Sequence, residues 1–389
     1  MEIRPVLGQQ DLGRFIDLPY RAYRDDPVWV APLRTEQWRQ FEARHNPMLE
    51  HCEYQLFLLM DRRRVVGRIA AFVDHLAVKT WEEPIGLFGS FECVAYQQGA
   101  HMLLDAARSW LQTKKMTAMR GPWSFSSQEW GMVVEGYTPS PVIMAPYNPP
   151  VYNEWVSTFG MEKVKDLRVY LIDMQAGYVI PDRYLRVTDR VRERYGIQVR
   201  PVDMDDLESQ VETIMDLSNQ SIKPNWGYYP VTAAESQAIA NDIKRLVNPK
   251  AVLLAYDSDE RPVGFAIALP DVNTLLKGLN GRMLPFGWLK MLLGLHRIAQ
   301  YRMWALGVLP EYHGRGVDAL IYRGLYEQLA GIKARIEINY VLEDNVQMNN
   351  ALKGLGVEDL RRYRVYQMGI LSKLATISTS TIRSSRKVR

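Results

Sequence analysis

The chain contains little cysteine, no long apolar run and almost no excess of charge. Two cysteines among 389 residues, Cys52 and Cys93, are too few for a disulfide framework or a cysteine-based zinc site. The six histidines form no H-x-x-x-H pattern, so the sequence predicts no metal site. No run of about 18 uncharged apolar residues occurs, which excludes a membrane-spanning helix. The polar stretch after Met1 does not resemble a signal peptide, and we therefore expect a cytoplasmic protein.

The charge is balanced over the body of the chain. Four of the 48 Lys and Arg residues lie in the last fifteen residues, and the remainder equal the 44 Asp and Glu residues in number. A neutral body gives no reason to expect nucleic-acid binding. The Ser- and Thr-rich end, residues 373–389, is predicted to be a disordered basic tail. Hydrophobic content of 47% and the chain length indicate a globular protein of two domains.

An internal repeat divides the chain into two copies of one plan. The strings IRPV at Ile3–Val6 and VRPV at Val199–Val202 lie 196 residues apart. The segments 56–72 and 252–269 both read as an apolar run, a charged turn and a second apolar run, which predicts a hairpin. Residues 152–170 and 348–366 share an Asn, a Gly, a Glu and an Arg-Val-Tyr string, again 196 residues apart. Matches in the same order predict two α/β units, each a twisted mixed sheet flanked by helices.

The repeat also predicts domain boundaries, because its offset changes where one copy carries extra residues. The predicted parts are a first unit at 1–175 with an insertion at 123–147, a linking helix at 176–197, and a second unit at 198–372 with an insertion at 272–300.

The second copy contains a glycine turn that is typical of anion binding. An apolar run, Trp304–Leu309, has the length and composition of a strand and is ended by Pro310. Gly314 and Gly316 follow, and a helical pattern begins at once. Unpaired backbone N–H groups at a helix N-terminus bind phosphates well. Glycines also serve ordinary strand-to-helix turns, so the turn alone is a weak signal.

The second copy, residues 199–370, resembles a GCN5-related N-acetyltransferase (GNAT) domain. Glu311 to Gly316 matches the family's acetyl-CoA signature, Gln/Arg-x-x-Gly-x-Gly/Ala, except at Glu311, whose side chain we expect to point away from a phosphate. The later family motif keeps its spacing of eleven from Asn345 to Gly356, but Leu352 stands where the family often has a tyrosine acid. Longer strings such as RGPWSFSSQEWG, YNPP and ALGVLPEYHGRGVDA resemble a group of bacterial GNAT-like proteins over nearly the whole chain. The first copy keeps only Gly99 of the turn and is therefore predicted to be a degenerate unit.

The resemblance implies acetyl-CoA, or another acyl-CoA, held by the second copy between its fourth and fifth strands. Backbone N–H groups of the fourth strand would polarise the thioester, and the turn would hold the pyrophosphate. The residues expected to contact the cofactor are Leu306, Gly307, Val308, His313, Gly314, Arg315, Gly316, Val317 and Asn345. An attacking amine must lose a proton, and Glu337 and Glu343 are the nearest candidate catalytic carboxylates. Glu337 is equally compatible with a paired strand residue that has no part in the chemistry.

The two insertions each admit two interpretations. The first combines aromatic rings with polar groups that suit a pocket wall, but it also suits a loop that packs on its own domain. Its predicted substrate-pocket residues are Trp123, Ser124, Ser126, Gln128, Glu129, Tyr147 and Asn148. The second insertion is basic and amphipathic over residues 275–298. It would lid a hydrophobic substrate, touch a membrane surface, or cover the interface between the copies.

We expect a CoA-dependent N-acyltransferase that acts on an amine of a small molecule or peptide. An alternative is a GNAT-like binding or regulatory protein without turnover, which the departures at Glu311 and Leu352 favour. A third is transfer from aminoacyl-tRNA, which the neutral body disfavours. The sequence leaves the acceptor, the acyl chain and the oligomeric state open.

Overall fold

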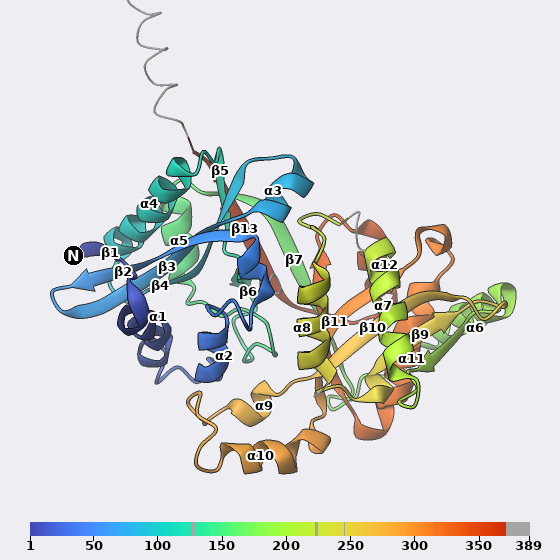
Figure 1. The fold of residues 1–389 in the computed structure, drawn as a ribbon. Coiled ribbons are helices and arrows are strands. Elements are labelled where there is room, and N and C mark those ends of the chain that lie inside the picture. The colour runs from blue at the N-terminus through green and yellow to red at the C-terminus, as the bar shows by residue number, and fades with distance from the viewer. Residues whose placement is uncertain (126–128, 222–224, 245, 371–389) are drawn as a thin grey trace, which may run out of the picture.

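The structure is a computed structural model that describes residues 1–125, 129–221, 225–244 and 246–370. The predicted tail at 373–389 and the predicted pocket residues Ser126 and Gln128 lie outside the described residues. Figure 1 shows the described chain as one elongated α/β molecule with helices on both faces of a long twisted sheet.

The helices and strands follow a similar order in the two copies. The first copy contains β1 (Glu2–Pro5), α1 (Gly8–Ala22), α2 (Arg34–Arg39), η1 (Pro47–Glu50), β2 (Cys52–Asp61), β3 (Arg64–Asp74), α3 (His75–Trp81), β4 (Ile85–Cys93), α4 (Gln97–Thr113), β5 (Ala118–Gly121), β6 (Met132–Glu135), α5 (Val151–Thr158) and β7 (Glu162–Asp173). The linking helix is α6 (Asp182–Tyr195). The second copy contains β8 (Gln198–Pro201), α7 (Leu207–Ser221), α8 (Ala233–Lys244), η2 (Pro249–Ala251), β9 (Val252–Tyr256), β10 (Pro262–Pro270), α9 (Asn273–Leu276), α10 (Gly287–Gly294), η3 (Leu295–Arg297), β11 (Gln300–Val308), η4 (Pro310–Tyr312), α11 (Val317–Leu329), η5 (Ala330–Ile332), β12 (Arg335–Leu342), α12 (Val346–Leu355) and β13 (Glu358–Gly369).

The two copies share a single sheet, because each gives its last strand to the other. The order within the described residues is β1-β2-β3-β4-β5-β13-β7-β12-β11-β10-β9-β8, with β6 paired to β13 off this path. Strand β7 ends the first copy in the sequence but pairs with β12 of the second copy. Strand β13 ends the second copy but pairs with β5 of the first. The sequence repeat predicts two mixed sheets, and the exchange of end strands joins them edge to edge.

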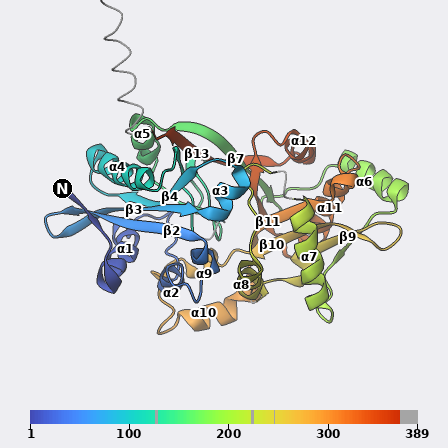
Figure 2. The same cartoon turned by 45° about the horizontal axis from the view of Figure 1, so that its top comes forward.

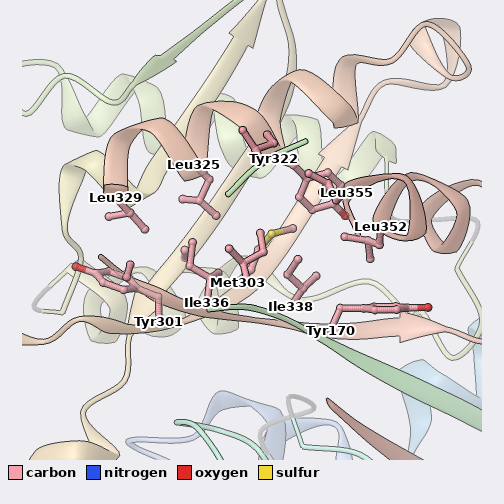
Figure 3. Packing of buried hydrophobic residues seen from close by; sticks show 14 of the residues in the cluster. Tyr170, Tyr301, Met303, Tyr322, Leu325, Leu329, Ile336, Ile338, Leu352 and Leu355 are labelled. Atoms are coloured by element: carbon pink, nitrogen blue, oxygen red, sulfur yellow. The ribbon is translucent and has the colours of Figure 1, made fainter. Parts of the chain in front are cut away.

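The core of the second copy therefore contains a strand of the first. Tyr170 of β7 packs among Ile338, Leu352 and Leu355, all of which are fully or almost fully buried (Figure 3). Its hydroxyl donates to the side-chain oxygen of Asn349 at 2.7 Å, which satisfies a polar group inside this core. Removing β7 would expose the apolar face on which α11 and α12 rest.

Helices cover both faces of the shared sheet. Figure 2 shows α4, α5, α12 and α6 on one side and α1, α2, α8 and α10 on the other. The linking helix α6 ends at Gly196, whose φ of 64° is the left-handed conformation that glycine adopts most readily. It packs against α11, where Arg323 donates to Asp189 at 2.6 Å and to the Thr188 hydroxyl at 2.8 Å.

Buried polar contacts also join the two units. Asp271, just after β10, accepts the backbone N–H of Ile143 from the first insertion at 2.8 Å and that of Asn273 at 3.2 Å. The aromatic ring of Trp81 lies against the second copy, and its N–H donates to the carbonyl oxygen of Tyr228 at 3.0 Å. The first contact fixes the first insertion to the end of β10, and the second fixes α3 to the segment between α7 and α8.

The Asp271 carboxyl should make the stability of this junction depend on pH. Burial raises its pKa from 3.8 to about 7, although two N–H donors oppose the shift. The folded protein then keeps a proton that the unfolded chain releases, so stability should fall as pH rises from about 4 to about 7, by at most about 4 kcal/mol. Asp271→Asn keeps the accepting oxygen and should remove this loss. Urea unfolding at pH 5 and pH 8 measures the difference.

The matched control for this prediction is Asp259→Asn in the exposed turn between β9 and β10. It should leave the pH dependence of unfolding as in the parent chain. Equal pH dependence in the Asp271→Asn protein and its parent would contradict the prediction.

Candidate functional site

Strands β11 and β12 part in the middle of the sheet. They pair in parallel from Gln300 opposite Arg335 to Met303 opposite Ile338, and no farther. The register of β10 on β11 shifts at this point and skips Trp304, which is a β-bulge. Beyond it, β11 runs to Val308 without β12 as a neighbour, so its facing edge offers backbone N–H and C=O groups. This gap contains the predicted residues Leu306, Gly307 and Val308.

The glycine turn closes the end of this gap. Gly314 and Gly316 have φ of 73° and 79°, the left-handed region that favours glycine. A Cβ on Gly316 would lie 3.0 Å from Val191 of α6, so the linking helix also requires a glycine there. His313 donates from Nε2 to the carbonyl oxygen of Val308 at 2.9 Å and thereby holds the turn against the strand. The first N–H groups of α11, starting at Val317, point out of this turn.

Two charged residues of the turn are directed elsewhere. Glu311 forms an ion pair with Arg261 at 2.9 Å, so its carboxylate points away from the helix N-terminus, as the sequence predicts. Arg315 is exposed and stacks on the ring of Tyr312, with 4.8 Å from its guanidinium carbon to the ring centroid. Asp318, in the first turn of α11, is half-buried. Burial raises the pKa of the Asp318 carboxyl, while the backbone N–H groups of Ala319 and of Asp318 itself lower it.

The predicted motif from Asn345 to Gly356 forms helix α12. The side chain of Asn345 caps the helix by accepting the N–H of Met348 at 3.0 Å, and the left-handed Gly356 ends it. Leu352, at the position of the family's tyrosine, is fully buried in the core. A donor for a leaving group must therefore come from another element.

A cavity of about 850 Å³ opens from the gap. It lies between the sheet and the helices α7 and α8, and its walls are mainly apolar. Among its lining residues are Ile214, Met215, Ile239, Ala240, Phe265, Ile267, Ala305, Leu306, Trp130 and Trp226. Its size is near the upper end of ordinary ligand pockets, about 300–1,000 Å³.

A second cavity of about 400 Å³ lies on the other side of the glycine turn. It is bounded by Gly314, Gly316, α6 and α12, and Arg183 contributes a positive charge to its wall. Asp318 and Gln347 line both cavities. The two spaces therefore meet at the N-terminus of α11.

Polar side chains gather on the wall of the larger cavity where the strands part. Arg302 is buried and donates to the carbonyl oxygen of Ile143 at 2.7 Å. Its guanidinium carbon lies 5.1 Å from the ring centroid of Tyr340. The Tyr340 hydroxyl is buried beside the backbone of Trp130. Burial raises the pKa of Tyr340, which keeps the hydroxyl protonated as a possible donor.

Glu129 of the first insertion lies next to this group. Burial raises the pKa of its carboxyl, and the nearby Arg302 lowers it. Its charge also acts on Tyr340. The neighbouring Trp130 lines the cavity, so the first unit reaches the gap of the second.

The two predicted catalytic carboxylates do not line the cavity. Glu337 is fully buried, opposite Arg302 in the β11–β12 register, and burial raises its pKa. Neither of its oxygens has a hydrogen-bond partner among the described residues. Glu343 forms an ion pair with Lys163 at 2.6 Å and accepts the N–H of Asp166 at 3.0 Å, which is a structural role at the end of β12.

Most of the described pocket residues of the first insertion have structural contacts. Trp123 is fully buried and stacks on Trp130 at 4.3 Å between ring centroids. Ser124 accepts the N–H of Glu129 at 3.3 Å. Tyr147 donates to Asp26, and Asn148 is buried, where it accepts the N–H of Val133 at 2.7 Å. Trp123 and Ser124 thus support the wall that Trp130 presents, whereas Tyr147 and Asn148 are held by other residues of the first unit.

Sequence reasoning missed Tyr340, Arg302 and Trp226 as cavity residues. Tyr340 lies only three residues beyond Glu337, but the register shift after Ile338 breaks the alternation used to assign faces. Trp226 carries no motif. The sequence also predicts no metal site, yet the fold places ligand-type atoms of His51, Cys52 and Asp74 within 4.8 Å of one another.

The first copy has a corresponding strand end that is blocked. Strand β4 pairs with β5 only over Ile85–Leu87 and then continues to Cys93 without β5 as a neighbour, while β3 stays paired on its other edge. The hydroxyl of Tyr152 accepts the N–H of Cys93 at 2.9 Å and donates to its carbonyl oxygen at 3.1 Å. A side chain of the protein therefore occupies the backbone groups that a ligand would need.

Comparison with solved structures defines the class of this fold. A tandem GNAT protein from the clavulanic acid biosynthesis pathway has a TM-score of 0.56 at 13% identity, over 95% of this chain and 98% of that chain. A GCN5-related N-acetyltransferase from Sphaerobacter thermophilus has a TM-score of 0.50 at 14% identity, over 95% and 96%. The parted parallel strands and the glycine turn, within a plan that occurs twice, agree with these structures, so this chain has a tandem GNAT fold. No family model matches it.

Two curated proteins are similar over nearly their whole lengths. Protein YghO of Escherichia coli is 29% identical over 376 residues, 95% of each chain. The bacterial ceramide synthase of Caulobacter vibrioides is 30% identical over 379 residues, 95% of this chain and 98% of that protein. The chain belongs to the family of the bacterial ceramide synthase. Among the described residues, no helix is both long and apolar enough to cross a bilayer.

The Asp318 carboxyl should weaken the binding of an anion such as CoA at the glycine turn. The backbone N–H groups of Ala319 and Asp318 act on this carboxyl, and its negative charge lies at the N-terminus of α11, where it opposes a second anion. Asp318→Asn should therefore tighten CoA binding about fivefold, measured by calorimetry. Glu311→Gln, on the same turn but paired with Arg261, should leave the affinity unchanged. Weaker CoA binding by the Asp318→Asn protein would contradict this placement.

Proposed function

We propose that the protein is a CoA-dependent N-acyltransferase whose acceptor is a long-chain amine of the sphingoid-base class. The gap between β11 and β12, which opens directly into a large apolar cavity, carries this proposal. A ceramide is an amide between a fatty acid and a long-chain amino alcohol, and a relative that is 30% identical over 379 residues is called a bacterial ceramide synthase. An apolar space of about 850 Å³ suits hydrocarbon chains better than it suits a polar peptide.

We assign the acyl-CoA donor to the second unit. The N–H groups of the turn, Gly314 to Val317, would hold the pyrophosphate, and the smaller cavity beside Arg183 would hold the nucleotide end. The thioester would lie in the gap, where N–H groups of Gly307 and its neighbours stabilise negative charge on the carbonyl oxygen. The first unit, in which Tyr152 blocks the equivalent strand end, would bind no CoA.

The reaction requires two proton movements. The amine nitrogen attacks the thioester carbon, the C–N bond forms, the C–S bond breaks, and the sulfur leaves with the electron pair and takes up a proton. Tyr340, a protonated hydroxyl on the cavity wall, is placed to donate that proton. Glu129 does not itself line the cavity, but it directly precedes the lining residue Trp130 and its charge acts on Tyr340, so we assign its carboxylate to the proton lost by the amine. Solvent exchange restores both groups.

Turnover with purified protein tests the function. With a long-chain acyl-CoA and sphinganine, mass spectrometry should detect the N-acyl product together with stoichiometric free CoA. The alternative of a ligand-binding or regulatory protein is favoured by the buried Leu352, which removes the family's usual acid. Tight CoA binding without product over long- and short-chain amines would select that alternative.

The cavity should set the chain length of the substrates. Ala240→Phe fills space on the α8 wall, so kcat/KM for long-chain substrates should fall about tenfold while short-chain substrates are affected less. Ala234→Phe, on an exposed position of the same helix, is the matched control and should change neither value. An equal loss for long and short chains would refute a chain-binding role.

The pH profile of kcat should separate the two proton-transfer residues. Tyr340→Phe should lower kcat about 100-fold with little change in KM, because only the donor is lost.

Burial raises the pKa of Glu129 above its ordinary 4.5, so kcat should rise with pH through that higher value as the carboxylate forms. Glu129→Gln should lower kcat and flatten this rise. Unchanged kcat in either variant would exclude that residue.

A further inference from the structure

The second insertion carries a dense group of exposed apolar side chains. Leu284 and Phe286 are 77% and 74% exposed, and Leu292 is 67% exposed. Together with Trp288, Leu289 and Leu293 they form the α10 patch, six large apolar residues within ten positions that the chain leaves in solvent. Such a contiguous patch is unusual on a protein that only meets water and indicates an interaction surface.

Helix α10 carries apolar side chains on both its inner and its outer face. The inner face, including Met291 and Leu295, packs with Leu276, Ile298 and Ile143 of the first insertion. The outer face carries Trp288 and Leu292, one turn apart, and Leu289 and Leu293, also one turn apart. The inner face confirms that this segment covers the junction of the two copies. The outer face is exposed, and the indole N–H of Trp288 donates only to the carbonyl oxygen of Pro285 in the same segment, at 2.9 Å.

The charge of the segment selects the kind of partner. Residues 272–300 contain no Asp or Glu, while Lys277, Arg282, Lys290, His296 and Arg297 surround the patch. Arg282, Lys290 and Arg297 are exposed beside the apolar side chains. Apolar residues that include Trp and Phe, bordered by cations, match the interface of a bilayer that contains anionic lipids.

The patch is held in place and lies beside the cavity. The backbone N–H of Arg34 donates to the carbonyl oxygen of Gly281 at 3.0 Å, and Asn273 donates to the carbonyl oxygen of Pro141 at 3.0 Å. Leu246, just after α8, packs against the inner face of the insertion. Helix α8 forms one wall of the larger cavity, so Leu246 connects the insertion to the end of this wall.

We propose that the α10 patch docks the protein on the surface of an anionic bilayer, so that a lipid-like substrate passes from the bilayer toward the cavity beside α8. The patch inserts its apolar side chains among the lipid headgroups, and the surrounding cations contact lipid phosphates. The docking is peripheral and reversible, because the inserted helix is short. It extends the proposed function by naming the surface from which the substrate comes, and vesicle binding itself requires no turnover.

The first experiment measures binding of the full chain to vesicles by flotation. Phosphatidylcholine vesicles with phosphatidylglycerol should carry the protein, and vesicles of phosphatidylcholine alone should carry much less. The triple variant Phe286→Ser, Trp288→Ser, Leu292→Ser should bind these vesicles at least tenfold more weakly than the parent. The matched control is Leu7→Ser, Val94→Ser, Tyr96→Ser, three exposed apolar residues of the first unit, and it should bind as the parent does.

A second variant tests the charges separately. Arg282→Glu with Arg297→Glu leaves the apolar patch intact and should weaken binding to phosphatidylglycerol vesicles by about fivefold or more per residue. High salt should reduce parent binding in the same direction. Thermal unfolding must give equal melting temperatures for all variants, so that lost binding reflects the surface and not the fold.

Several results would overturn the proposal. The first is that the parent protein does not bind phosphatidylglycerol vesicles. The second is that the Leu7, Val94, Tyr96 control loses as much vesicle binding as the patch variant. The third is a concentration-dependent dimer of the parent that the Phe286, Trp288, Leu292 variant abolishes. The last result would make the patch an interface between copies. Failure of the proposed function has a different signature, which is vesicle binding by the parent without N-acyl product. If the protein is an N-acyltransferase and docks through the α10 patch, the patch variant should lose activity on sphinganine in vesicles and keep its activity on a short, water-soluble amine.

Discussion

The pairing of β7 with β13 is the interaction on which the rest of the structure depends. These strands are antiparallel neighbours from Glu358 opposite Leu171 to Gln367 opposite Glu162, at the centre of the shared sheet. Because β7 comes from the first copy and β13 from the second, neither unit has a complete sheet without the other. The cavity wall then combines Trp130 of the first copy with Trp226 of the second, as one would expect when two sheets are held in fixed register. Such a junction makes domain motion across the cavity costly, because it would break a buried ladder.

The two copies differ at the corresponding ends of β11 and β4, one of which is open and the other blocked. In the second copy the strand runs past its neighbour and leaves backbone groups open beside the glycine turn. In the first, the hydroxyl of Tyr152 bonds both backbone groups of Cys93 and fills the equivalent place. One copy is thus preorganised for a ligand, and the other is closed by its own side chain. The closed copy still contributes to the candidate site through the insertion that carries Glu129 and Trp130.

Much of the fold could be predicted from local patterns. The hairpins, the turn at Gly314 and Gly316, and the short helix from Asn345 to Gly356 depend on backbone preferences and apolar spacing within a few residues. The orientation of Glu311 away from the turn was predicted from simple charge repulsion, and its ion pair with Arg261 agrees with that expectation. The predicted carboxylates were less successful, since Glu337 is buried behind the cavity wall and Glu343 is paired with Lys163. Alternation along β12 fails at the register shift, which depends on the neighbouring strand and not on the sequence of β12 alone.

The sequence by itself determined that the protein has two copies of one α/β unit and that only the second keeps the turn with Gly314 and Gly316, because both features are local or repetitive. The tertiary structure decided that the copies exchange their last strands, that Tyr340 and Arg302 meet Trp130 of the first insertion at the gap, and that the outer face of α10 is exposed. The physical reason is that burial is a nonlocal property. An apolar helix face or a strand edge has the same sequence whether it packs on its own unit, on the other unit or on nothing in the chain, and only the complete packing distinguishes these cases.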